Sequence, residues 1–351
     1  MDTVRVVNED YLGNPPVARS KRRRPWLLPW MIVVLYPGLI SAFASAVRSA
    51  HQSSSFFAGI SAVALMLVAF SIPVLAGRAL LITHNDVQAF RARALLYLMF
   101  ATSSLFSLAH TLSTRFAGLG YGALSALWIS AWAIAGAWLY FRKTSIVRKP
   151  SNAVLKGLRV THGITALCLL CGFIIAHLIN HDLAAWSIPL HTSVLKGLRV
   201  WYRSESVEPV LLGLFGVMLL TGVPLVIHYS RRAMDAFRVI QVATGVYIGV
   251  FVCSHVLATL AARAKGAETD WFFAAGPATL LDGSLLARLI PHYFFASFFF
   301  CVHVACGLRI VLLQHGTPNQ VGNRVAFGVA GAGLVVTVVL FSALLGFHVE
   351  R

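Results

Sequence analysis

The sequence predicts an all-α polytopic membrane protein with about nine transmembrane helices. Of its 351 residues, 58% are hydrophobic and only 12% are charged. Several apolar runs reach about 20 residues, the length that an α-helix needs to cross the hydrocarbon core of a bilayer. The basic residues gather in a few short segments between these runs, which is typical of the cytoplasmic loops of membrane proteins.

The apolar runs, taken in chain order, predict nine spans. They cover residues 26–47, 57–82, 94–112, 120–141, 159–180, 208–229, 237–260, 285–314 and 325–348. The first run follows the basic stretch Lys21 to Arg24. It is longer than the apolar core of a signal peptide, which is about 7–15 residues, so we interpret it as a transmembrane helix.

The spans divide into two membrane regions. We expect a basic cytoplasmic N-terminus at 1–25, a four-helix membrane region at 26–141, a basic cytoplasmic linker at 142–158 and a five-helix domain at 159–351. This last domain is the helical bundle on which the functional argument depends.

Short sequence motifs of the first membrane region recur in the second. Ala89-Phe90-Arg91 precedes a helix that ends at His110, much as Ala236-Phe237-Arg238 precedes the helix that carries His255. Pro73 likewise echoes Pro224. The pattern suggests that 26–141 is a degenerate repeat of the second region.

The net charge of +17 would suit a nucleic-acid partner, but its distribution does not. The arginines and lysines concentrate in segments 83–93, 142–158, 230–236 and 315–324, whereas segments 181–207 and 261–284 mix both signs. The positive-inside rule therefore predicts an integral protein of a bacterial inner membrane, with the N-terminus cytoplasmic. We expect anionic lipid rather than nucleic acid as the counter-charge.

Four histidines, His177, His228, His255 and His303, each lie within or at the end of a different predicted helix. Ionisable residues inside spans are rare and mark functional sites by default. At about 1.5 Å per residue, His177 and His255 lie about 25–27 Å up their ascending helices, and His228 and His303 about 27–30 Å down their descending helices. The depths predict an outer pair, His177 with His255, and an inner pair, His228 with His303.

The inner match depends on where one helix begins. A start at Leu285 gives His303 the depth of His228, whereas a start at Pro291 would place it nearer to the middle of the bilayer.

Paired imidazoles at matched depth are typical of haem iron with both axial positions filled. Such a centre has no open site, which favours electron transfer over oxygen chemistry. The four histidines therefore predict two b-type haems, with these side chains as the iron ligands. Arg231, Arg232 and Arg309 lie at the level of the inner pair and are candidates for contacts to haem propionates, although topology alone also explains arginines there.

The remaining histidines are expected to have simpler roles. For His110 and His162 we expect hydrogen bonds between helices, with a propionate contact as the alternative for His162. His292 follows Pro291 and is expected at the membrane interface. The histidines expected in solvated loops or interfaces are His51, His84, His181, His191, His315 and His348.

Several local motifs between about residues 159 and 347 resemble a known family. His162-Gly163 is followed fifteen residues later by His177, Pro224-Leu precedes His228, and His303 is followed by Gly307-Leu308. In this order they resemble the cytochrome b membrane-anchor subunits of succinate dehydrogenase and fumarate reductase, in their two-haem, five-helix form. The resemblance implies the same two histidine pairs. It also implies electron transfer between a membrane quinone and flavoprotein and iron–sulfur subunits at the cytoplasmic face.

The sequence departs from that family in three respects. Four additional helices precede the matching region, and the loop between the second and third family helices is short. No carboxylate stands at a clear quinone-binding position, since Glu208 and Asp182 lie at the outer level without convincing spacing.

Three functions are compatible with these patterns. The first is an electron-transfer subunit of a quinone oxidoreductase, and the second is a haem-bearing, redox-sensing anchor for a signalling partner. The third is a non-haem transporter or structural membrane protein whose histidines only join helices. No nucleotide, flavin or iron–sulfur motif is present and no catalytic residue can be named, so we expect an electron-transfer subunit rather than a self-sufficient enzyme.

Overall fold

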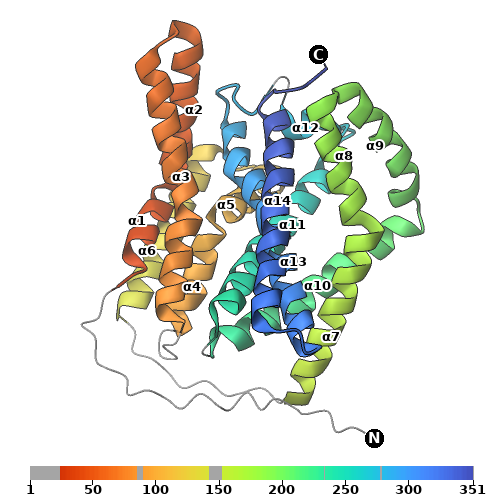
Figure 1. The fold of residues 1–351 in the computed structure, drawn as a ribbon. Coiled ribbons are helices and arrows are strands. Elements are labelled where there is room, and N and C mark those ends of the chain that lie inside the picture. The colour runs from red at the N-terminus through yellow and green to blue at the C-terminus, as the bar shows by residue number, and fades with distance from the viewer. Residues whose placement is uncertain (1–23, 85–89, 142–151, 233, 277–278, 351) are drawn as a thin grey trace, which may run out of the picture.

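The computed structural model describes residues 24–84, 90–141, 152–232, 234–276 and 279–350 (Figure 1). Every regular element in these ranges is a helix. Seven helices are long and apolar enough to cross a membrane, and the number rises to nine if each of two bent helix pairs is one span. The all-α polytopic membrane fold predicted from the sequence is therefore confirmed.

The N-terminal region forms a bundle along one side of the molecule (Figure 1). Its elements are α1 (Leu27–Val34), α2 (Tyr36–Ser53), α3 (Phe56–Thr83), α4 (Phe90–Phe100), α5 (Thr102–Thr111), the π-helix η2 (Leu112–Phe116) and α6 (Tyr121–Phe141). The pair α1 and α2 is bent by 58°, and α4 and the α5–η2 segment by 69°. Pro37 in the first turn of α2 explains the first bend, because proline starts a helix readily but cannot continue one.

The C-terminal region forms the rest of the bundle. Its first elements are α7 (Asn152–Leu169), the π-helix η3 (Leu170–Ile174), α8 (Ile175–Trp186), α9 (Ile188–Tyr202) and α10 (Val207–Ser230). They are followed by α11 (Ala236–Arg263), α12 (Trp271–Ala275), the 3₁₀ helix η4 (Leu285–Arg288), α13 (Leu289–Gln314) and α14 (Asn319–Leu344).

Several predicted boundaries shift. The fifth span runs over Val154–Trp186 instead of 159–180, and the last helix begins at Asn319 and ends at Leu344 rather than covering 325–348. The predicted outer segment 181–207 contains a helix of its own, α9, which packs back against α8. The basic N-terminus up to residue 23 and most of the predicted linker, 142–151, lie outside the described residues.

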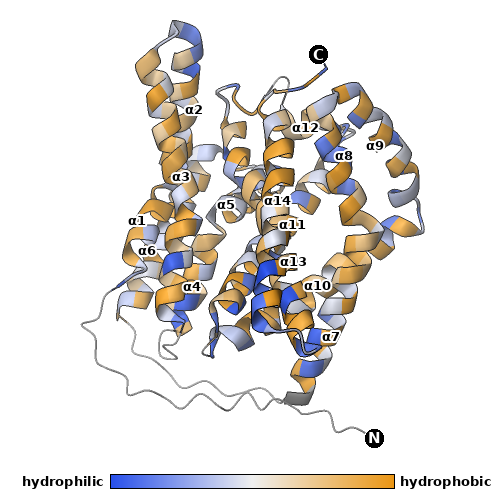
Figure 2. Cartoon of the chain, viewed as in Figure 1, coloured by the Kyte–Doolittle hydropathy of each residue, from blue (hydrophilic) through white to orange (hydrophobic). Residues whose placement is uncertain are grey.

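The surface of the C-terminal helices is mostly apolar, as contact with lipid requires. Only 11% of the apolar window of Val154–Trp186 is buried within the chain, so side chains such as Val160, Ile164 and Leu167 face outward. In the coloured view, polar residues gather near the helix ends at the lower side of the molecule, while the middle of the bundle is apolar (Figure 2).

One hydrophobic core joins the two regions. It combines residues of α3 to α6 with residues of α11 and α13. Phe100 of α4 stacks on Phe299 of α13 with ring centroids 4.7 Å apart, and Phe70 of α3 lies 4.9 Å from Phe295. The N-terminal helices thus form part of the wall around the centre of the bundle.

Candidate functional site: an outer histidine pair and its surroundings

The structure brings His177 of α8 and His255 of α11 together. Their ring centroids are 6.2 Å apart and their planes are inclined by 65°. Each ring is held by an aromatic side chain one turn earlier on its own helix. Phe173 stacks on His177 at 5.0 Å, and Phe251 stacks on His255 at 5.4 Å.

The spacing of the outer pair fits two axial ligands of one iron. Iron–nitrogen bonds of about 2 Å, with about 1.2 Å more from each nitrogen to its ring centre, place opposite imidazoles about 6.3 Å apart. Among the described residues, no group of three or more histidine, cysteine, aspartate or glutamate side chains is arranged to hold a metal ion. A centre of the bis-histidine type uses only two protein ligands.

A buried polar seam connects the N-terminal helices to this site. The Ser104 hydroxyl of α5 lies 3.0 Å from His292 Nδ1, and Ser103 Oγ lies 2.7 Å from the Tyr247 hydroxyl. His292 in turn packs on Phe251 with ring centroids 4.7 Å apart. His292 is therefore buried within the bundle, in the first turn of α13.

More histidine rings extend the outer pair toward the outer face. His181 lies 4.5 Å from His177 and 5.3 Å from His191, measured between ring centroids. His191 is fully buried, and its Nδ1 lies 2.7 Å from the carbonyl oxygen of Asn180. The expectation that His191 is solvated is therefore wrong, because α9 packs against α8 and buries it, whereas His181 is half-buried.

Burial decides the protonation state of His191. Loss of water lowers the pKa of its imidazole, and the nearby Arg199 guanidinium lowers it further. The hydrogen bond to the Asn180 carbonyl and the carboxylate of Asp270 raise this pKa, but the net direction is downward. His191 is therefore neutral at pH 7.

The inner histidines have separate surroundings. His303 Nδ1 lies 2.9 Å from the carbonyl oxygen of Gln241, and the ring packs so closely on α11 that a Cβ at Gly245 would come within 2.9 Å of it. His162 Nδ1 lies 2.9 Å from the Thr221 hydroxyl, in agreement with its expected interhelical hydrogen bond. His162 is also an electrostatic neighbour of His303.

His228 is buried near the end of α10, where its ring centroid is 5.1 Å from that of Tyr229. The 3₁₀ helix η4 runs directly into α13, so the span that carries His303 begins at Leu285, as expected, and not at Pro291. The pairing of His228 with His303 stays a prediction.

The candidate propionate arginines are partly engaged by other groups. Arg309 donates from Nε to Asn323 Oδ1 at 2.7 Å and pairs with Asp235 at 3.4 Å. Arg231 packs over the ring of Phe90, while Arg232 uses its backbone carbonyl to accept a bond from Arg93.

Arg238, which was assigned no specific role, is an electrostatic neighbour of His303 and donates to Gln241 Oε1 at 2.7 Å. Arg238 therefore lies near one of the inner histidines, His303. Neither the hydropathy of the sequence nor the spacing of its residues distinguishes Arg238 from the other arginines at the inner level.

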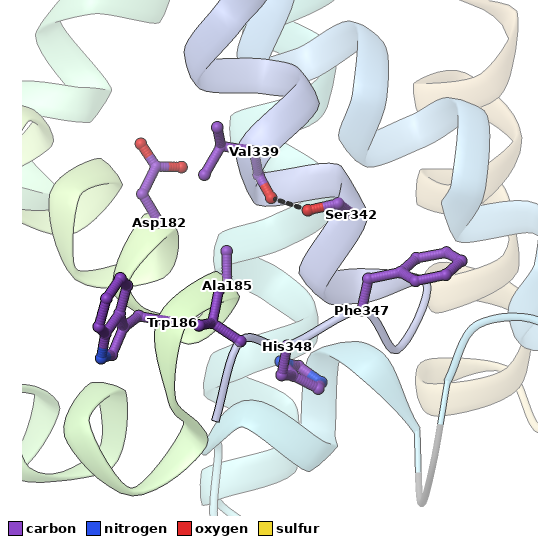
Figure 3. Close-up of a pocket in the computed structure, with 8 residues that line it drawn as sticks. Asp182, Ala185, Trp186, Val339, Ser342, Phe347 and His348 are labelled. Atoms are coloured by element: carbon purple, nitrogen blue, oxygen red, sulfur yellow. Dashed lines mark hydrogen bonds between the residues drawn. The ribbon is translucent and has the colours of Figure 1, made fainter. Parts of the chain in front are cut away.

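Two grooves meet at Asp182 on the surface between α8 and α14. One has a volume of about 450 Å³ and is lined by Trp186, Val339 and the C-terminal residues Phe347 and His348 (Figure 3). The other has a volume of about 280 Å³. It is lined by Leu170, Ile175, Leu178, Ile179, Asp182, Phe300, Cys301, Val304, Val329, Ala332, Gly333 and Val336. Asp182 is the only charged residue in either lining, and its Oδ1 is buried without a hydrogen-bond partner among the described residues.

Glu208, the other outer carboxylate considered from the sequence, pairs with Arg263 across α10 and α11. Of the two carboxylates, only Asp182 opens into an apolar groove.

Comparison with protein-family models, curated proteins and solved structures finds no match to this chain.

Proposed function

We propose that this chain is a membrane-embedded dihaem b-type cytochrome that transfers electrons across the bilayer between a quinone pool and a cytoplasmic partner. The separation of 6.2 Å between the His177 and His255 rings carries this proposal, because it matches the geometry of two axial imidazoles on one iron. His228 and His303 are the ligands of the second, inner haem. Arg231, Arg232, Arg238 and Arg309 supply positive charge for its propionates.

A haem held by His177 and His255 would supply reversible one-electron chemistry. The residues of this chain position it. Phe173 and Phe251 fix the planes of the two imidazoles, and the packed aromatic wall of α11 and α13 excludes water. The partner at the cytoplasmic face is a flavoprotein and iron–sulfur pair, as the family resemblance implies.

The groove of about 280 Å³ beside Asp182 supports quinone as the membrane substrate. A quinone combines a polar ring with an apolar tail. The groove offers one carboxyl group, from Asp182, and apolar side chains from α8, α13 and α14 along the stretch of α8 that also carries His177. This arrangement of a few polar groups within an apolar lining is typical of small-molecule sites.

The first test is the dithionite-reduced minus oxidised visible spectrum of the purified protein, with haem measured per chain. We expect two b-type haems and no spectral change under carbon monoxide, because both axial positions are filled. His177→Ala and His255→Ala should each remove the outer haem and leave one haem per chain. His228→Ala and His303→Ala should do the same for the inner haem.

The matched control is His51→Ala, which changes an exposed histidine at the outer end of α2 and should retain both haems. Pigment that persists unchanged in all four ligand variants would contradict the assignment of the ligands. A colourless protein from haem-replete cells would contradict the cytochrome itself and favour transport or a structural role.

A further inference from the structure

A group of cationic side chains lies where the N-terminal bundle meets the start of α13. Arg288 is the last residue of η4, and its electrostatic neighbours are Arg115 of η2, Tyr36 of α2, Tyr121 of α6 and Tyr293 of α13. The helix η4 packs against α2, and α5, which leads into η2, packs against α13. Neither arginine has a part in the haem sites proposed above.

These two arginines have no carboxylate partner within the described part of the chain. Neither Arg288 nor Arg115 forms a salt bridge there, and the groups that act on Arg288 are tyrosines and the second arginine. Two other arginines on the predicted outer side, Arg199 and Arg263, each pair with a glutamate. A positive charge that is partly removed from water is costly without a counter-ion. The two unpaired arginines therefore indicate a site for an anion.

Unpartnered donor atoms mark the same place. Nε of Arg288 and the hydroxyl of Tyr36 are both buried without a hydrogen-bond partner among the described residues, and Tyr36 is fully buried. One terminal nitrogen of Arg288 donates to the carbonyl oxygen of Leu285 at 2.7 Å, which orients the guanidinium. Buried donors nearly always have acceptors. Neighbouring N–H and O–H donors beside a positive charge suit an oxyanion such as phosphate.

The rim of this site is apolar. The π-helix η2 carries the exposed Arg115 and also leaves Leu112 and Phe116 outside the core, with exposed fractions of 45% and 61%. Apolar side chains next to the cations give nothing to a free phosphate ion, which is fully hydrated. They suit the acyl chains of a lipid, whose headgroup then lies at the arginines. The rim therefore favours a lipid over a soluble anion.

We propose that Arg288 and Arg115 bind the phosphate group of an anionic phospholipid, with the hydroxyl of Tyr36 as a further donor. The planar guanidinium matches the geometry of phosphate oxygens, and basic pockets between transmembrane helices bind lipid headgroups. The site needs both membrane regions, because η2 and α2 belong to the first and η4 to the second. It does not depend on haem at any of the four histidines.

The test uses the full-length protein, freed of lipid in detergent and titrated with phosphatidylglycerol, phosphatidylcholine or inorganic phosphate. Native mass spectrometry gives the affinity for each lipid, and tryptophan fluorescence gives the thermal unfolding midpoint. The variants are Arg288→Gln, Arg115→Gln and Tyr36→Phe. Arg324→Gln is the matched control, since it removes one exposed positive charge near the start of α14, at the opposite end of the bundle.

We expect the wild type to bind phosphatidylglycerol more tightly than phosphatidylcholine, whose choline group cancels the charge of its phosphate. Arg288→Gln and Arg115→Gln should each weaken binding of phosphatidylglycerol by about 10- to 100-fold, the effect of losing a charge-assisted hydrogen bond. Tyr36→Phe, which loses a hydrogen bond from a neutral donor, should weaken it by about 2- to 10-fold. Arg324→Gln should bind as the wild type does.

The unfolding midpoints separate lipid binding from a purely structural role of Arg288. Without lipid, Arg288→Gln should be at least as stable as the wild type, because it removes a charge that has no partner within the described chain. Phosphatidylglycerol should raise the midpoints of the wild type and of Arg324→Gln, but not that of Arg288→Gln. A lipid-free Arg288→Gln protein that is less stable than the wild type would overturn the role given to Arg288.

Equal affinity for phosphatidylglycerol in the wild type, Arg288→Gln and Arg115→Gln would overturn the site. A wild type that binds phosphatidylcholine as tightly as phosphatidylglycerol would overturn it as well. Inorganic phosphate that raises the wild-type midpoint as much as phosphatidylglycerol would overturn the lipid as the source of the phosphate group. If Arg288→Gln does not fold, Arg115→Gln decides among these outcomes, because its side chain is exposed.

Discussion

At the scale of single residues, the outer site is defined by what each imidazole touches. His255 and His292 both pack on the Phe251 ring, at centroid distances of 5.4 Å and 4.7 Å. Ser104 bonds to Nδ1 of His292, so a residue of the N-terminal region positions a side chain in contact with the ligand shell. We therefore expect the hydroxyl of Ser104 to contribute measurably to the stability of the protein.

Ser104→Ala should destabilise the protein by about 1–3 kcal/mol, because it leaves Nδ1 of His292 buried without a partner. The measurement is the thermal unfolding midpoint in detergent, followed by tryptophan fluorescence. Ser61→Ala is the matched control, since that exposed hydroxyl bonds only to a carbonyl of its own helix. An unchanged midpoint in Ser104→Ala would show that the seam contributes nothing to stability.

Depth along the helices predicted that His177 and His255 share one level, and in the structure their rings lie 6.2 Å apart. Depth did not predict the surroundings of His181, His191 and His292. These depend on α9 folding back over α8 and on α5 packing against α13, which are tertiary contacts that no local pattern specifies. The unpartnered Oδ1 of Asp182 could likewise be recognised only from the structure, in which α14 packs against α8.

At the scale of elements, apolar periodicity located the spans but not their breaks. The bend before α2 has a sequence signal in Pro37, whereas the break at Ala101 between α4 and α5 has neither proline nor glycine. The π-helix η3 falls within the span that carries His177, and π-helices often occur at functional sites. Hydropathy cannot distinguish a π-turn from an α-turn, so this feature needed the structure.

The helices α13 and α14 pack closely against each other. A Cβ on Gly333 would overlap the side chain of Cys301, whereas a Cβ on Gly331 would meet nothing within 4 Å. Gly333→Ala should therefore force the two helices apart and cost about 1–3 kcal/mol. Gly331→Ala should leave stability unchanged or raise it by up to about 1 kcal/mol through helix propensity.

The unfolding midpoints of both variants test this packing. Cys301→Gly in the Gly333→Ala background should recover much of the loss, because it removes the atoms that the new methyl group meets. A coupling energy near zero between these two substitutions would show that the destabilisation arises elsewhere.

At the scale of the whole molecule, the two membrane regions are not independent units. The predicted boundary at 142–158 separates them in sequence, but a single core continues across them. Tyr247 of α11 is fully buried. Its hydroxyl bonds Ser103 of α5, and its ring lies 6.4 Å from that of Phe100 of α4. The four additional helices therefore shield one side of the five-helix bundle from lipid.

This shared core predicts that the C-terminal region needs the N-terminal region but not a covalent link to it. Residues 1–141 and 152–351, expressed together as separate chains, should assemble and co-purify through a tag on one of them. Residues 152–351 expressed alone should aggregate, because the aromatic wall of α11 and α13 would lose the N-terminal side chains that pack against it, such as Phe70 and Phe100.

Size-exclusion chromatography in detergent distinguishes these outcomes. Phe100→Glu in the N-terminal chain is the control, since a carboxylate against Phe299 should prevent assembly by placing an unpaired charge in the core. A monodisperse C-terminal chain that keeps both predicted haems without its partner would show that the N-terminal helices serve a separate purpose. Co-purification that depends on Phe100 would instead show that the N-terminal helices are a structural part of the outer site. The reason is that α4, which contacts α13 through Phe100, leads directly into α5, whose Ser104 bonds His292.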